Sequence, residues 1–130
     1  MTIDNILLDR LTAQAKESPR LRMNLDLRNS SEDSSQRMLN AIEPGSEVPI
    51  HRHRSTSETM VVLRGRVVEE YYSSEGVVEA AYDLAAGGPV CALNIPAGQW
   101  HTLRALESGT VILEMKDGAY EPIQECDILK

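Results

Sequence analysis

The sequence predicts a mainly β protein in which short strands form a sandwich or closed barrel after one opening helix. Three observations support this prediction. Apolar residues near the start recur at helical spacing, the spacing changes to two from Arg20, and turn residues then divide the chain into about eight or nine strand-like stretches. The length of 130 residues fits one compact domain. We divide it into a helix within residues 1–19, a barrel over 20–118 and a tail over 119–130.

The opening helix is predicted over residues 3–16. Ser18 and Pro19 end it, because a proline cannot continue a helix. Its apolar face is expected to comprise Ile3, Ile6, Leu7, Leu11 and Ala15.

The first strand is predicted over residues 20–27, where apolar and polar residues alternate. One face carries Leu21, Met23, Leu25 and Leu27, and the other carries Arg20, Arg22, Asn24 and Asp26. The polar face has two interpretations. It is either a solvated strand edge that deters aggregation, or a substrate-binding surface. In the second case, Arg20, Arg22 and Asn24 bind a carboxylate or phosphate.

The later strands follow a polar loop at residues 29–35 and are separated by turns rich in glycine, proline and serine. They are expected at 36–42, 48–53, 59–63, 67–72, 77–84, 90–95, 100–106 and 110–115. Both cysteines are expected to be free thiols, and Cys91, which lies inside an apolar stretch, is expected in the core.

The charge of the chain argues against several partners. The net charge is −7 with a pI near 4.9, and no lysine or arginine cluster offers a binding surface for nucleic acid. No apolar run approaches the roughly 18 residues of a membrane span. The start of the chain lacks the pattern of a secretory signal, so we expect a cytoplasmic protein.

The three histidines of the chain are the main candidates for a functional site. His51 and His53 are two residues apart in an expected strand, so their side chains leave the same face with Cα atoms roughly 7 Å apart. Glu58 follows five residues later and offers an oxygen ligand, and His101 follows a Pro-x-Gly turn. A barrel can bring His101 over the first pair. The pattern therefore predicts a site for one divalent metal ion.

These residues and their spacing resemble the two sequence motifs of the cupin superfamily. The first motif is matched by Gly45, His51, His53, Glu58 and Gly65, and the second by Pro96, Gly98 and His101. The resemblance implies a cupin-type double-stranded β-helix, a jelly-roll barrel, with His51, His53, Glu58 and His101 as metal ligands. The chain departs from the second motif at two points, and neither involves an expected metal ligand. Seven residues separate Gly88 from Pro96, where five is common, and Ala105 replaces the usual asparagine.

A closer resemblance covers nearly the whole chain. The opening helix, the segments SPRLRMN, QRMLNAIEPG and VLRGRV, and the stretch from Ile95 to Pro122 are similar to the WbuC-type cupin metalloproteins. These proteins occur with enzymes of bacterial surface-polysaccharide biosynthesis. Because the family has no defined reaction, the resemblance supports the fold and the metal more strongly than it supports a reaction.

Three imidazoles and one carboxylate leave one or two coordination positions open, which favours chemistry over a closed structural site. The ion is expected to be Fe, Mn, Ni, Co or Zn, because the sequence does not decide among them. The first hypothesis is an isomerase or epimerase that binds a small hydroxy- or keto-substrate. The second is an Fe(II)-dependent dioxygenase. The third is a non-catalytic module that binds or senses a small ligand through the metal.

Four other polar residues are candidates for the pocket. Gln36, Asn40, Tyr72 and Gln99 are candidate pocket residues whose default role is packing or surface, and Trp100 is expected to pack away from His101. No general base stands out, because Glu69, Glu70, Tyr71 and Tyr72 cannot be assigned to the inside or outside of the barrel. We expect a small-molecule ligand and a homodimer, since a polar-faced strand can pair with a neighbouring sheet edge.

Overall fold

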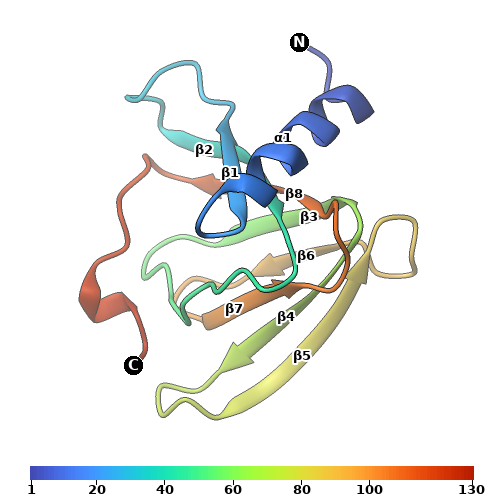
Figure 1. The fold of residues 1–130 in the computed structure, drawn as a ribbon. Helices are drawn as coiled ribbons and strands as arrows, with labels where there is room; N and C mark the ends of the chain where they lie inside the picture. Colours follow the sequence, from blue (N-terminus) through green and yellow to red (C-terminus); the bar gives the residue numbers. More distant parts are fainter.

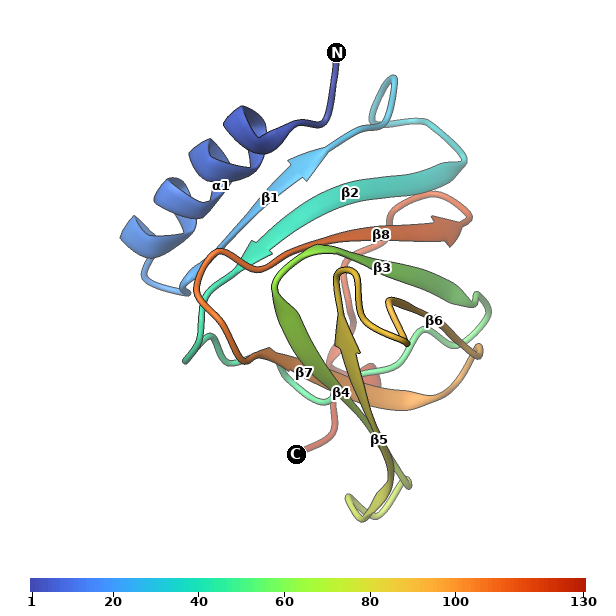
Figure 2. The ribbon, with the colours of Figure 1, turned by 90° about the vertical axis from the view of Figure 1, so that its right-hand side faces the viewer.

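A computed structural model describes residues 1–130 and contains one α-helix and two antiparallel sheets (Figure 1). The elements are α1 (Asn5–Glu17), β1 (Arg22–Asp26), β2 (Ser35–Ile42), β3 (Glu58–Arg64), β4 (Arg66–Tyr72), β5 (Val78–Ala85), β6 (Ala92–Ile95), β7 (Trp100–Ala105), β8 (Val111–Asp117) and a 3-10 turn, η1 (Glu125–Asp127). The strand order is β1-β2-β8-β3-β6 in the larger sheet and β5-β4-β7 in the smaller. Figure 2 shows the sheets curving around a common interior with α1 outside. The predicted jelly-roll barrel with an N-terminal helix is confirmed.

The outer face of the larger sheet is covered by α1. The helix begins after Asp4, whose carboxylate accepts a hydrogen bond from the Leu7 backbone N–H at 3.0 Å, and it ends before Ser18. Its buried residues are Leu7, Leu8, Leu11, Thr12 and Ala15. The four apolar residues among them pack on Leu39, Ala41 and Val111 of the sheet, and on Met23 and Leu25 of β1. The alternation in β1 therefore turns its apolar face toward the helix.

Part of the predicted helix face is wrong. Ile3 and Ile6 are exposed, Ile6 by 79%, whereas Leu8 is buried. The buried stripe follows positions 7, 8, 11, 12 and 15, and Ile6 lies beside this stripe and faces away from the sheet.

The interior of the barrel has an apolar end and a polar end. The apolar end is a cluster of Ile42, Met60, Val62, Val67, Leu84, Ala105 and Ile112. The same strands place polar residues further along the inner face: Glu58 precedes Met60 on β3, and Glu69 follows Val67 on β4. The apolar end therefore stabilises the fold, and the polar end provides side chains that can bind a ligand or a metal ion.

Two sequence predictions fail in the fold. Residues 48–53 form no strand and make only isolated bridges from His51 to His101 and Ile128, and Pro49 has no N–H to donate to a neighbouring strand. Cys91 is exposed. It lies just before β6, a four-residue strand at the edge of its sheet.

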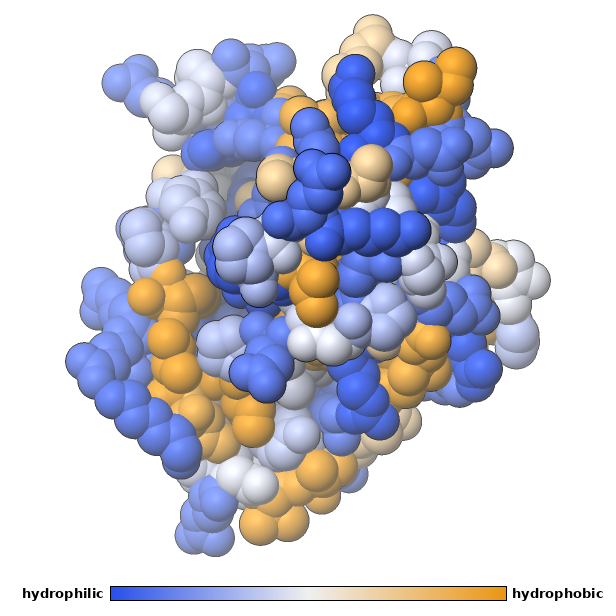
Figure 3. All heavy atoms as spheres, in the orientation of Figure 1, coloured by the Kyte–Doolittle hydropathy of each residue, from blue (hydrophilic) through white to orange (hydrophobic).

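The surface mixes charged and apolar residues. Figure 3 shows apolar atoms across the lower part of this face, where Figure 1 shows the β4–β5 hairpin. Val77 and Val78, at the end of that hairpin, are 60% and 50% exposed. None of the helices is both long enough and apolar enough to cross a bilayer.

Candidate metal centre

The three histidines come together at the polar end of the barrel. His101 lies on β7, and His51 and His53 lie on the connection between β2 and β3. Two backbone hydrogen bonds join His51 and His101, at 3.0 and 2.8 Å, and the Gly98 N–H donates to the His53 carbonyl at 2.7 Å. The ligand nitrogens of the three side chains all lie within 4.8 Å of one another. The backbone pairing of the two motif segments thus produces the cluster.

The hydrogen bonds of two rings determine which nitrogen is free. Nδ1 of His51 lies 2.8 Å from the Pro49 carbonyl oxygen, and Nδ1 of His101 lies 2.9 Å from that of Gln99. A carbonyl oxygen only accepts, so both Nδ1 atoms carry the hydrogen. The lone pairs of both Nε2 atoms therefore remain for a metal, as in the usual arrangement of histidine ligands.

Glu58, at the first position of β3, completes the cluster on one side. Its Oε2 lies 3.3 Å from Nε2 of His53 and 3.6 Å from Nε2 of His101. This oxygen is buried and has no hydrogen-bond partner. Burial alone would raise the pKa of Glu58, but the neighbouring His101 and His53 outweigh burial and lower it.

His51 is in the protonation state that a metal requires. Burial, and then the neighbouring His101, lower its pKa to about 4. The ring is therefore neutral at pH 7 and can bind a cation. Three nitrogen donors and an unpartnered buried carboxylate oxygen fit a divalent ion, so the cluster can hold one.

The cluster forms one wall of a cavity of about 200 Å³. Arg20, Arg22 and Asn24 line this cavity, so the polar face of β1 turns toward the histidines. Gln36 and Asn40 line it as well, whereas Tyr72 and Gln99 do not. Gln99 instead donates from Nε2 to the backbone carbonyls of Tyr72 and Trp100, at 3.2 and 3.0 Å.

Two further carboxyl groups line the cavity: Glu69, which the sequence left unassigned to either face, and Glu114, which was not among the sequence candidates. Glu69 on β4 is fully buried, and burial, followed by the charge of Glu58, raises its pKa to about 9. Burial and Glu58 also raise the pKa of Glu114 on β8 to about 8, although Asn40 Nδ2 donates to it at 3.3 Å. The sequence does contain a sign that Glu114 is buried, because it is the one charged residue in the apolar stretch VILEM.

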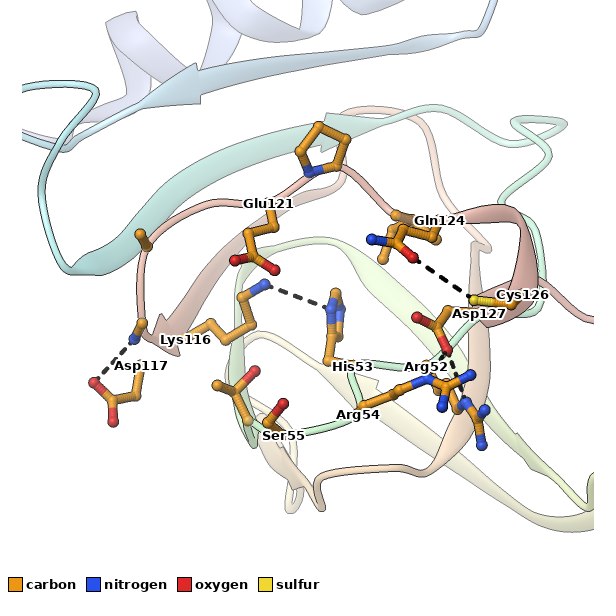
Figure 4. A pocket seen from close by; sticks show the side chains of 15 residues that line it. Arg52, His53, Arg54, Ser55, Lys116, Asp117, Glu121, Gln124, Cys126 and Asp127 are labelled. Carbon is orange, nitrogen blue, oxygen red and sulfur yellow. Dashed lines mark hydrogen bonds and ion pairs between the residues drawn. The ribbon is translucent and has the colours of Figure 1, made fainter.

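A second cavity of about 550 Å³ lies on the other side of His53 (Figure 4). Lys116 points across it, with Nζ 3.5 Å from Nδ1 of His53. Arg52 and Arg54 flank His53 in the sequence. Both donate to Asp127 near the C-terminus, at 3.0 and 2.6 Å.

The C-terminal segment and Trp100 support the histidine segment from outside. The Arg52 N–H donates to the Asp127 carbonyl at 3.0 Å, and the Leu129 N–H donates to that of Ile50 at 2.8 Å. The Arg52 guanidinium stacks on the Trp100 ring, 4.4 Å from its centroid. Trp100 therefore packs, as predicted.

Several solved structures share the fold of this chain at low sequence identity. The chain matches CapF, the capsular polysaccharide assembling protein from Staphylococcus aureus, with a TM-score of 0.68 and 18% identity over 85% of this chain and 32% of CapF. It matches the Cnp3 cupin domain of Schizosaccharomyces pombe with a TM-score of 0.58 and 13% identity, over 76% of this chain and 65% of the Cnp3 chain. A recombinant oxalate oxidase in complex with glycolate matches with a TM-score of 0.62 and 16% identity, over 82% of this chain and 55% of the oxidase chain. This chain therefore spans about a third of CapF and has the cupin fold.

The sequence itself identifies the family. Residues 3–84 match the family described as "Domain of unknown function (DUF6016)", and the chain belongs to that family. No curated protein sequence matches the chain.

Proposed function

We propose that this protein is a metal-dependent enzyme that isomerises or epimerises a small oxygen-rich substrate, such as a sugar derivative. The observation that carries the proposal is the shared cavity. Its wall contains three histidines with converging donor atoms, and it also contains a buried carboxyl group, Glu69, that has no partner in the protein. A metal cluster beside an unused proton carrier is the arrangement that such a reaction requires.

In this proposal His51, His53, His101 and Glu58 hold one divalent transition metal ion. Fe, Mn, Ni, Co and Zn all accept such a set of nitrogen and oxygen donors. When bound, the ion supplies Lewis-acid stabilisation to a substrate carbonyl and to the negative charge that develops on it. The backbone bonds between His51 and His101 hold the donors in position before the ion arrives.

The proton carrier is assigned to Glu69. It lies on β4, across the barrel interior from β3, and lines the cavity without being a member of the histidine cluster. In its ionised form this carboxyl group can take the proton from a substrate carbon, and as the acid so formed it can return the proton to the neighbouring carbon, so that one group serves both halves of an isomerisation. Arg20, Arg22 and Asn24 are proposed to bind a carboxylate or phosphate of the substrate at the cavity entrance.

Comparison with known proteins supports the substrate class. CapF carries the description of a capsular polysaccharide assembling protein, and the oxalate oxidase structure contains glycolate, a small hydroxy acid. Together with the sequence resemblance to WbuC-type cupins, these relatives favour a sugar derivative of surface-polysaccharide biosynthesis as the substrate.

The first test is elemental analysis of protein purified without a metal-chelating tag. We expect about one equivalent of a transition metal in the parent and much less in His101→Ala, because three donors cannot hold the ion as four do. Arg104→Ala is the control, since Arg104 is an exposed residue of the same strand and pairs with Glu70. No metal in the parent after reconstitution would overturn the proposal.

A second test separates the hypotheses for the reaction. Isomerisation through an enediolate predicts deuterium incorporation from solvent into hydroxy-aldehyde or hydroxy-ketone sugars, read by NMR and abolished by Glu69→Gln. Oxygen uptake by the iron-loaded protein would instead indicate a dioxygenase. Ligand binding without exchange or uptake across a broad panel would indicate a non-catalytic binding module.

A further inference from the structure

The cavity beside the histidines contains buried polar atoms for which the protein provides no partner. Apart from Oε2 of Glu58, which faces His53 and His101, they are Oε1 of Gln36, Oδ1 of Asn40 and both carboxyl oxygens of Glu69. Gln36 is only 8% exposed and Glu69 is fully buried. Buried polar groups in folded proteins are nearly always paired, so four unpaired oxygens in one cavity point to a ligand that pairs with them.

These atoms require a particular kind of partner. The two amide oxygens can only accept hydrogen bonds, and the Asn40 amide nitrogen already donates to Glu114. A carboxyl group that has kept its proton, as the pKa of about 9 indicates for Glu69, both donates and accepts. Hydroxyl groups meet both requirements, because each can donate to an amide oxygen and exchange hydrogen bonds with a carboxyl group.

The entrance to the same cavity has the opposite character. Arg20 and Arg22 line it from the β1 side, and Arg20 is exposed. Arg22 uses one nitrogen, Nη1, to donate to the Glu47 carbonyl at 2.9 Å, which leaves its other donors free. Guanidinium groups bind carboxylates with paired hydrogen bonds. The cavity is thus acceptor-rich at its floor and cationic at its entrance.

An ammonium group could also donate to the floor, but the surrounding charges disfavour it. Arg22 and Lys116 are already close to the cavity and to His53, and Glu69 and Glu114 both have raised pKa values that reduce their negative charge. The volume of about 200 Å³ is below the roughly 300 Å³ at which pockets for drug-sized ligands begin. The ligand is therefore small.

We propose that the cavity binds a small polyhydroxylated carboxylic acid, with its hydroxyl groups toward Gln36, Asn40 and Glu69 and its carboxylate toward Arg20 and Arg22. This inference deepens the proposed function and rests on it for the position of the reacting carbon near the metal. The hydrogen-bonding preference of the floor does not depend on the ion.

The test uses four probes of matched length with the full chain, in metal-free and in zinc-loaded form. Gluconate has both the carboxylate and the hydroxyl groups, hexanoate has only the carboxylate, sorbitol has only the hydroxyl groups, and 6-aminohexanoate replaces them with an ammonium group. Isothermal titration calorimetry is expected to give at least ten-fold tighter binding for gluconate than for each of the other three, in both forms of the protein.

Variants on one strand test the floor directly. Glu69→Leu removes both carboxyl oxygens from the cavity and is expected to weaken gluconate binding at least five-fold while leaving the weak binding of hexanoate unchanged. Glu70→Leu makes the same change on the outer face of β4, where Glu70 pairs with Arg104, and is expected to bind gluconate like the parent. Gln36→Leu provides a second floor variant if Glu69→Leu does not fold.

The outcomes separate this inference from the metal proposal. Equal binding of gluconate and hexanoate to protein that holds one metal ion would overturn the inference and leave the metal site intact. Tightest binding of 6-aminohexanoate would overturn it in favour of a cationic ligand. Preference for gluconate in protein that takes up no metal would support the inference and overturn the proposed function.

Discussion

Glu58 and Glu69 are carboxyl groups in one cavity, and their pKa values shift in opposite directions. Two neighbouring histidines lower the pKa of Glu58 against the effect of its burial, whereas Glu69 has no cationic partner and its pKa rises to about 9. One carboxylate is thereby prepared to bind a cation and the other to carry a proton. Pairs of acids whose environments separate their pKa values are characteristic of catalytic sites.

The raised pKa of Glu69 predicts how stability depends on pH. Between its ordinary pKa of 4.5 and its folded-state pKa of about 9, the unfolded chain is ionised at this residue while the folded protein keeps the proton. Stability therefore falls as pH rises through this range. Glu69→Gln removes the loss, and we expect it to raise the free energy of unfolding of the metal-free protein by about 3 kcal/mol at pH 7.

Urea denaturation at pH 5 and pH 8 checks this prediction, with a larger gain expected at pH 8. Glu70→Gln is the control, because this side chain lies on the outer face of β4, and we expect it to change stability by less than about 0.5 kcal/mol. A gain for Glu69→Gln that is the same at both pH values would contradict the assignment.

At the residue scale, the histidine cluster could be predicted from sequence and the two acids could not. The spacing of three histidines leaves few geometric alternatives once a barrel is assumed. In β4, by contrast, each face carries a valine, a glutamate and a tyrosine, so the alternation does not reveal which face is inside. Only the closure of the barrel distinguishes Glu69 from Glu70.

At the scale of elements, Gly65 joins β3 of the larger sheet to β4 of the smaller one. Its φ of +85° is in the left-handed region, and a Cβ atom there would lie 2.2 Å from Oγ1 of Thr110 and 2.8 Å from its Cα. Gly65 is the last residue of the stretch that resembles the first cupin motif. It forms the turn between the sheets, because neither the backbone conformation nor the available space allows a side chain there.

Replacement of this glycine is expected to destabilise the protein strongly. Gly65→Ala should reduce the free energy of unfolding by more than about 2 kcal/mol, because it adds a steric clash to the cost of its backbone conformation. Gly87→Ala is the matched control, with a φ of +72° and no atom within 4 Å of the added Cβ, and should cost only about 1 kcal/mol. Equal losses in thermal denaturation would show that the clash is relieved elsewhere.

The packing of α1 on the larger sheet gives a second prediction at this scale. Leu11 is 3% exposed within the helix–sheet cluster, so Leu11→Ala should reduce stability by about 2–4 kcal/mol. The metal content should not change, because α1 does not line the cavity. Ile6→Ala, at a residue that is 79% exposed, should be nearly neutral. Chemical denaturation with metal analysis of each variant provides the measurement.

Most strands could be predicted to within a few residues, because turn residues mark their ends. The segment 48–53 could not, since its apolar residues and alternating histidines read as a strand although its backbone pairs with two separate segments. Sequence periodicity reports which side chains share a face, but not whether a neighbouring backbone is available along the whole length.

At the scale of the whole molecule, the predicted homodimer stays a prediction. Strand β5 is at the edge of the smaller sheet, and Val78 and Tyr82 on it are 50% and 37% exposed. A long edge strand with apolar residues is prone to pair with a second chain. Light scattering after size exclusion should give twice the chain mass of 14.4 kDa, and Val78→Lys should shift it toward one chain. The mass of one chain for the parent would contradict the prediction.

The pairing of the C-terminal segment with Ile50 and Arg52 affects how the protein should be handled. Figure 1 shows the two termini far apart, with the C-terminal segment on the side of the β2–β3 connection. A polyhistidine tag after Lys130 would extend from residues that contact the metal-ligand segment, and its imidazoles could compete for the same ion. A cleavable tag before Met1, which is 88% exposed, leaves that contact undisturbed and makes the measured stoichiometry a property of the native histidines alone.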